Sequence, residues 1–309
     1  MQTIGEYAFY QCKKVKGDLI IPDAATSIGN YCFQESSFNG KLKLGNKLSS
    51  IGEYAFSKCT GFTGDLMIPD SVTTLGQYAF NECTGFTGDL TISDNLTEIA
   101  NYTFLGCSNL SGSISIGVNV TSIGIRAFAG NSSLTGNLVI PDKVKTIGAF
   151  AFTDCRGLTG YLYLGSQLER IGEAAFVSCE GTAKWRGTDG YSSLDGITYK
   201  YGNLYYYPTV LNFSRIYCSA TNPPIIHKID AAYYGYVSSI DCYNYLMRLD
   251  PERMGAKIGS FTSWMNVSGT SYSTPTKHKN LFVKIGTAQA YNDKESWSSC
   301  FSVIEETNF

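Results

Sequence analysis

The chain has 309 residues and a formal net charge of -2; 16% of its residues are charged, and it contains 32 glycines and 22 tyrosines. This near-neutral balance gives no electrostatic reason to expect nucleic acid or an anionic membrane surface as a partner. The sequence contains no apolar run of about 18 residues, so it predicts no membrane-spanning helix. This composition is typical of a folded protein rich in turns and strands.

The first residues of the chain match the middle of a later repeat. Residues 1–5 align with residues 25–29, so the first coil lacks its leading strand. No basic segment followed by an apolar core is present, and the sequence therefore predicts no signal peptide. We expect a trimmed or mature fragment, whose missing part could carry an export signal.

One motif, Ile/Leu-Gly-x-x-Ala-Phe, recurs along the first 180 residues. Its eight copies begin at Ile4, Ile28, Ile51, Leu75, Ile99, Ile123, Ile147 and Ile171. Six of the seven spacings are 24 residues and one is 23. A unit this short cannot bury its apolar side alone, so the repeats must stack on one another.

Each unit predicts two short strands and a turn. In the unit around Leu66, the alternation of Leu66 and Ile68 indicates a strand with one buried face. A Pro-Asp turn at 69–70 ends that strand, and a second short alternating segment covers 72–75. For residues 76–80 we expect a helix-like turn.

A phenylalanine closes every copy of the motif, and we expect these rings to stack as an aromatic spine along the axis. Neighbouring coils should lie about 4.8 Å apart, as parallel strands do. The column comprises Phe9, Phe33, Phe56, Phe80, Phe104, Phe128, Phe152 and Phe176.

The repeat resembles the BspA-like leucine-rich repeat, whose pattern is roughly L-x-I-P-x-x-V-x-x-I-G-x-x-A-F-x-x-C. Seven full coils and one partial coil cover residues 1–181. The resemblance implies an α/β solenoid, a right-handed superhelix of about 24-residue coils with parallel strands. Residues 216–224 and 281–306 resemble the segments that end this family's repeats. We therefore expect an irregular β-rich C-terminal cap over 182–309, with an insertion near 225–280.

Ten cysteines raise the alternatives of a disulfide scaffold or buried thiols. Six of them share one repeat position: Cys12, Cys59, Cys83, Cys107, Cys155 and Cys179. Stacking would bring their Cα atoms within disulfide range, but parallel side-chain directions make bridging awkward. We predict free, buried thiols at this column, and a packing role for Cys32. In the cap, one disulfide bond among Cys218, Cys242 and Cys300 is an alternative that the sequence leaves undecided.

The sequence predicts no catalytic residues, no cofactor and no metal site. His227 and His278 are the only histidines, and phosphate-loop, nucleophile-elbow and zinc-protease motifs are absent. The cysteine column forms a line, whereas structural zinc needs four ligands around one point. Nothing marks the carboxylate pair Glu305 and Glu306 as catalytic.

The predicted strands present outward side chains that form a broad, weakly charged sheet face. Between the buried positions these are Ile20, Lys43, Met67, Thr91, Ser115, Val139 and Tyr163, preceded by Asp18, Lys41, Asp65, Asp89, Ser113, Asn137 and Tyr161. Twelve of the 22 tyrosines fall between Tyr191 and Tyr245, which suits either recognition or a β-rich cap. Our candidate ligand-binding residues are Tyr161, Tyr163, Met67, Tyr205, Tyr206 and Tyr207.

The family resemblance implies a non-catalytic adhesion protein, extracellular or at the cell surface. Its solenoid would present a face to a protein or glycan ligand on host or neighbouring cells. Two alternatives stay open. The tyrosine-rich C-terminal region could bind or process glycans, which for cleavage needs two suitably spaced carboxylates. The chain could also be a structural spacer.

Overall fold

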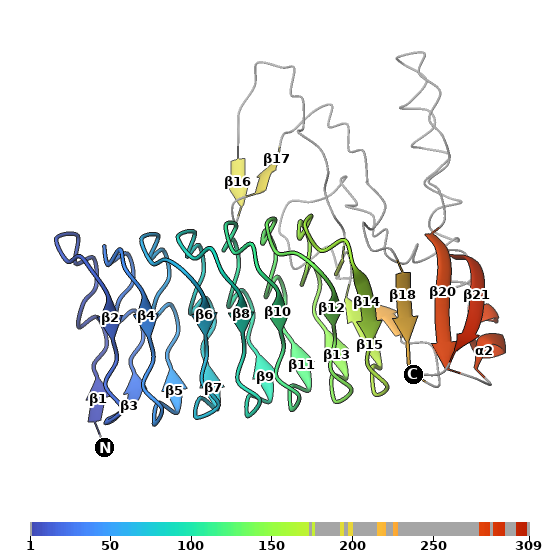
Figure 1. Ribbon diagram of the computed structural model, residues 1–309, viewed down its shortest axis with the longest axis horizontal. Coiled ribbons are helices and arrows are strands. Elements are labelled where there is room, and N and C mark those ends of the chain that lie inside the picture. The colour runs from blue at the N-terminus through green and yellow to red at the C-terminus, as the bar shows by residue number, and fades with distance from the viewer. Residues whose placement is uncertain are drawn as a thin grey trace, which may run out of the picture.

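A computed structural model describes residues 2–172, 175–176, 192–194, 197–199, 215–220, 225–227, 278–284, 287–293 and 301–307. The described part of the first 176 residues is a row of stacked coils, and two series of parallel strands run along its length (Figure 1). This confirms the predicted solenoid of about 24-residue coils.

The first strand of each coil is only two to four residues long. These strands are β2 (Leu19–Ile20), β4 (Leu42–Lys43), β6 (Leu66–Met67), β8 (Leu90–Thr91), β10 (Ile114–Ser115), β12 (Leu138–Val139) and β14 (Tyr161–Leu164). They pair in parallel in three groups (β2 with β4; β6, β8 and β10; β12 with β14), with equivalent residues aligned, as Leu66 with Leu90 and Leu90 with Ile114. Leu66 and Ile68 are buried and Met67 between them is exposed, so the predicted alternation is confirmed.

The second strand of each coil follows the turn and forms a second parallel series. Its members are β1 (Gln2–Ile4), β3 (Ala25–Ile28), β5 (Ser50–Ile51), β7 (Thr74–Leu75), β9 (Glu98–Ile99), β11 (Ser122–Ile123), β13 (Thr146–Ile147) and β15 (Arg170–Gly172). The isoleucine or leucine of the repeat motif is buried in each internal coil, from Ile28 to Ile171.

The expectation of a helix-like turn after each second strand is wrong. Residues 76–80 form turns, and Tyr78 has a backbone φ of 57°. The N–H of Phe80 donates to the carbonyl of Thr103 in the next coil, at 2.8 Å, whereas the N–H of Ala79 donates back to Gly76 at 3.3 Å. An α-helix would direct every such N–H within its own segment. Because some N–H groups donate within the turn and others donate to the next coil, the turn is hydrogen-bonded to the neighbouring coil.

The predicted aromatic spine is confirmed over its whole length. Each phenylalanine ring stacks on the next, from Phe9 to Phe176, with centroids 4.9–5.7 Å apart and planes within 10° of parallel. Phe56, Phe80 and Phe104 are fully buried, whereas Phe9 at the open end is 39% exposed.

The prediction of free thiols in the cysteine column is confirmed within the described residues, and that of burial is confirmed except at Cys12 in the first coil, which is only partly buried. Cys12, Cys59, Cys83, Cys107 and Cys155 are free thiols, as are Cys32 and Cys218. Burial raises the pKa of the Cys59 thiol to about 11 and that of Cys32 to about 12. Both thiols therefore stay protonated at neutral pH. Cys179, Cys242 and Cys300 lie outside the described residues.

The described C-terminal strands continue both strand series. From β14 the first series runs through β18 (Arg215–Cys218), β20 (His278–Lys284) and β21 (Phe301–Thr307), all parallel, and β19 (Ile225–His227) pairs with β15. β16 (Ser192–Leu194) and β17 (Ile197–Tyr199) form an antiparallel pair. The described strands agree with the β-rich character expected of this region, and the insertion expected near 225–280 lies mostly outside the described residues. The domain boundary at residue 181 stays a prediction, because residues 177–191 lie outside the described ones.

A short helix, α2 (Ala288–Asn292), packs against β21 at the C-terminal end of the row (Figure 1). Tyr291 on this helix is fully buried, and its hydroxyl donates to the carbonyl oxygen of Ala220 at 2.7 Å. The same hydroxyl lies 3.1 Å from the Cys218 thiol. Glu306 accepts the N–H of Ala288 at 3.0 Å, so this carboxylate has a structural role.

Candidate functional site

The outward face of the first strands (the first-strand face) carries three of our candidate residues. Met67 on β6 is 62% exposed, and Tyr161 on β14 is 37% exposed. The row runs from Met67 through Thr91, Ser115 and Val139 to Tyr163, four coils away. At about 4.8 Å per coil these ends are roughly 19 Å apart. The structure therefore does not bring Met67 into one site with the tyrosines.

Tyr161 and Tyr163 do lie together, two residues apart on β14. Their ring centroids are 6.2 Å apart and nearly perpendicular, at 87°. Tyr163 pairs in register with Val139 on β12, which is 52% exposed. These three side chains form one apolar and aromatic patch, which we call the tyrosine patch. Tyr205, Tyr206 and Tyr207 lie outside the described residues.

The acidic residues of the first-strand face have structural roles. Asp65 accepts the backbone N–H of Asp89 at 2.9 Å. Asp89 in turn accepts the N–H and the hydroxyl of Ser113, at 2.6 and 2.9 Å. These two hydrogen bonds hold the pKa of the Asp89 carboxyl below its usual value. The carboxylates therefore connect neighbouring coils and are poor candidates for ligand contacts.

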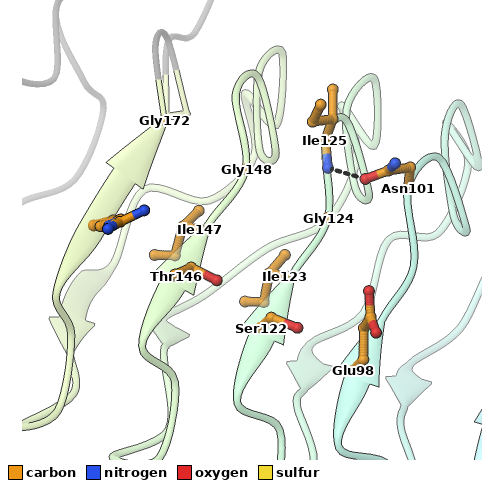
Figure 2. Close-up of a pocket in the computed structure, with 11 residues that line it drawn as sticks. Glu98, Asn101, Ser122, Ile123, Gly124, Ile125, Thr146, Ile147, Gly148 and Gly172 are labelled. Carbon is orange, nitrogen blue, oxygen red and sulfur yellow. Dashed lines mark hydrogen bonds between the residues drawn. The ribbon is translucent and has the colours of Figure 1, made fainter. Parts of the chain in front are cut away.

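The outward face of the second strands (the second-strand face) contains a groove that the sequence pattern does not reveal. The groove, of about 370 Å³, runs across β9, β11, β13 and β15. Figure 2 shows Glu98, Ser122 and Thr146 in a row on neighbouring strands, and Arg170 on β15 continues this row. We call this row and its walls the axial groove, because it follows the solenoid axis.

Glycine at the coil corner lets consecutive coils approach closely beside the axial groove. Gly124, Gly148 and Gly172 line one side of it. A Cβ atom on Gly148 would lie 2.5 Å from the backbone carbon of Gly124 and from the backbone nitrogen of Ile125. The close approach of consecutive coils therefore favours glycine at Gly148. The corner positions carry no side chain to fill the groove.

The two ends of the axial groove carry opposite charges. Glu98 and Arg170 are exposed, and within the described residues neither side chain has a hydrogen-bond or ion-pair partner. Three strand spacings separate them, which amounts to about 14 Å. Between them lie the hydroxyls of Ser122 and Thr146. The groove can therefore recognise a ligand with a cationic and an anionic group at this separation.

A column of stacked tyrosines was also missed. Tyr7, Tyr31, Tyr54, Tyr78 and Tyr102 occupy the position two before each phenylalanine, with centroids 4.5–4.9 Å apart. All five have φ between 54° and 61°, a conformation that costs most side chains roughly 1–2 kcal/mol. Ring stacking offsets this strain. In the next two coils Arg126 and Phe150 take the position, and the guanidinium lies 5.1 Å from the ring centroid.

In the part of the chain that the structure describes, no group of three His, Cys, Asp or Glu side chains could hold a metal ion. No described helix has the length and apolar character needed to cross a membrane.

Parallel strands stacked at 24-residue intervals, with exposed side chains along two lateral faces, define a leucine-rich-repeat solenoid, a repeat protein of the binding type. The BspA type leucine rich repeat region matches in six copies, over residues 2–135 and 63–183. The chain belongs to this family. No curated protein sequence matches it with significant similarity.

Several solved structures are similar to the chain. A T. pallidum leucine rich repeat protein is 24% identical, with a TM-score of 0.42 over 50% of this chain and 71% of that one. A leucine-rich repeat protein from Bacteroides ovatus is 20% identical, with a TM-score of 0.30 over 55% and 58% of the two chains. A leucine rich cell surface protein from Faecalibacterium prausnitzii is 21% identical, with a TM-score of 0.29 over 56% and 59%.

Proposed function

We propose that the chain is a non-catalytic binding protein, secreted or held at a cell surface. Its solenoid presents side chains to a protein or glycan ligand on host or neighbouring cells. Membership of the BspA-type family supports this role and this location.

One structural observation carries the proposal. Several polar side chains of the described solenoid form contacts between coils, as those of Asp65 and Asp89 do. Tyr161 and Val139 of the tyrosine patch, and Glu98 and Arg170 of the axial groove, are exposed to solvent. Tyrosine supplies a large, rigid contact area with a polar tip, which suits macromolecular recognition.

The test is a binding screen with the folded chain. Immobilised protein is exposed to solubilised host-surface and matrix proteins and, separately, to a glycan array. We expect the screen to retain a partner. Tyr161→Ala with Tyr163→Ala alters the tyrosine patch, and Arg170→Glu alters the axial groove. Either change should weaken capture of the partner at least about tenfold, or 1.4 kcal/mol. Ser115→Ala, on the first-strand face but outside the tyrosine patch, is the matched control. Background capture in both screens by folded protein would refute the proposal.

A further inference from the structure

The axial groove has a length and a charge distribution that indicate its ligand. Resting on the binding role proposed above, we propose that it takes an extended peptide segment of a partner protein. The segment lies across β9, β11, β13 and β15 and carries one basic and one acidic side chain four residues apart.

The spacing follows from two repeat lengths. Glu98 and Arg170 are separated by three strand spacings, or about 14 Å. Four residues of extended chain span almost the same length, roughly 13–14 Å at 3.3–3.4 Å per residue. Residues an even number apart in an extended chain point to the same side. Both charged side chains of such a peptide can therefore face the groove at once.

The interior of the axial groove suits a peptide backbone. Ser122 and Thr146 lie between the two charges, and a hydroxyl can both donate to and accept from a peptide group. The walls at Gly124 and Gly148 are formed by backbone atoms. The lining includes no aromatic ring on which a sugar could stack. These features favour a peptide over a glycan.

The charges at the ends set the specificity. Beside Arg170, Lys145 and Glu169 pair with each other at 3.9 Å, so they add no net charge to that end. Asn101, beside Glu98, is neutral and binds the N–H of Ile125 at 2.7 Å (Figure 2). A cationic side chain is therefore attracted to the Glu98 end and an anionic one to the Arg170 end. A peptide running in either chain direction can satisfy both.

The first experiment measures spacing with capped, fluorescent peptides of nine residues, titrated against the full chain. Each carries one lysine and one glutamate, separated by three, four or five positions in a serine and alanine background. We expect spacing four to bind about tenfold more tightly than spacing three or five, a difference of 1.4 kcal/mol. The advantage should shrink at high salt, because exposed charges are screened.

The second experiment changes the protein. Arg170→Glu makes both ends acidic and should switch the preference to a peptide with two lysines at spacing four. Glu98→Arg should switch it to a peptide with two glutamates. The double variant carrying both changes restores opposite ends and should again prefer the mixed peptide, which binds in the reverse direction. Lys43→Glu, on the first-strand face, is the control and should change nothing.

The outcomes separate this inference from the broader function. Equal binding at all three spacings, or variants that leave the preference unchanged, would overturn the peptide assignment. Heparin binding that is stronger in Glu98→Arg and lost in Arg170→Glu would also overturn the peptide assignment. It would indicate that the ligand is an anionic polysaccharide. If a partner captured in the screen is insensitive to these variants, the binding role stands and the groove is not its site.

Discussion

The thiol of Cys107 donates a hydrogen bond to the backbone carbonyl oxygen of Phe80, in the preceding coil, over 3.0 Å. The same contact recurs at 2.9–3.1 Å in three other coils: Cys59 with Phe33, Cys83 with Phe56, and Cys155 with Phe128. The cysteine and phenylalanine columns therefore work together, since the thiol bonds to the backbone that carries the preceding ring.

Asn131 replaces cysteine in one coil and tests this interpretation. Its side-chain N–H donates to the carbonyl oxygens of Phe104 and Phe128 at 2.8 and 2.6 Å, but its own Oδ1 is buried without a partner among the described residues. A buried, unpaired acceptor costs about 1–3 kcal/mol. Asn131→Cys keeps a donor and removes that acceptor, so we expect it to raise the free energy of unfolding by about 1 kcal/mol.

Urea unfolding followed by circular dichroism measures this change. Asn131→Ala is the control, because it removes donor and acceptor together and leaves a small cavity, so it should be less stable than Asn131→Cys. A cysteine variant less stable than the parent chain would contradict the role assigned to the thiol.

The aromatic spine predicts a gradient of stability from its end to its interior. Phe80 is fully buried between the rings of Phe56 and Phe104, at 5.0 and 5.7 Å. Phe80→Ala should cost about 3–5 kcal/mol through lost burial and the cavity left behind. Phe9 is 39% exposed and stacks on Phe33 alone within the spine, so Phe9→Ala should cost less than half as much. Equal urea midpoints for the two variants would contradict a continuous core.

Repetition explains which features the sequence could predict. The phenylalanine and cysteine columns were predictable because nearly the same residue returns every 24 positions. The spacing of Gly76, Ala79 and Phe80 resembles that of a helix, and for this reason it favours a helix-like turn. Hydrogen bonds to the next coil, such as that from Phe80 to Thr103, form in place of the hydrogen bonds of a helix.

The axial groove could not be predicted in the same way. Glu98, Ser122, Thr146 and Arg170 occupy one repeat position, which carries serine or threonine in the other coils and a charged residue only at Glu98 and Arg170. Its meaning depends on which neighbours the stacking brings together. The tyrosine column gave a stronger signal, but Arg126 and Phe150 interrupt it.

The corner glycines predict a difference between internal and terminal coils. A Cβ on Gly76 would lie 2.5 Å from the backbone nitrogen of Glu53, whereas one on Gly5, at the same repeat position, would meet nothing within 4 Å. Gly76→Ala should therefore destabilise the protein by about 1–3 kcal/mol, the usual cost of overpacking. Gly5→Ala should change stability by less than about 0.5 kcal/mol.

Ala100 occupies the same repeat position, which shows that local adjustment can admit a methyl group there. Thermal unfolding of the two variants side by side is the measurement. A Gly5→Ala variant as unstable as Gly76→Ala would mean that backbone conformation, and not the neighbouring coil, makes glycine necessary.

The buried thiols predict that stability falls at alkaline pH. Burial raises the pKa of Cys59 to about 11 and of Cys32 to about 12, against 9.0 for an ordinary thiol, and it also raises the pKa of Cys83 and Cys155. The folded state therefore keeps protons that the unfolded chain releases. This stabilisation is complete below pH 9 and is lost as the pH rises through 11–12.

The measurement is the free energy of unfolding in urea between pH 8 and 11. Tyrosine and lysine also titrate in this range, so one thiol is isolated by comparison with Cys59→Ser, whose hydroxyl does not ionise there. Each thiol contributes a slope of up to about 1.4 kcal/mol per pH unit above its unfolded pKa. The parent chain should therefore lose stability more steeply than Cys59→Ser from pH 9 to 11. Parallel curves would show that Cys59 ionises as readily in the folded protein as in the unfolded chain.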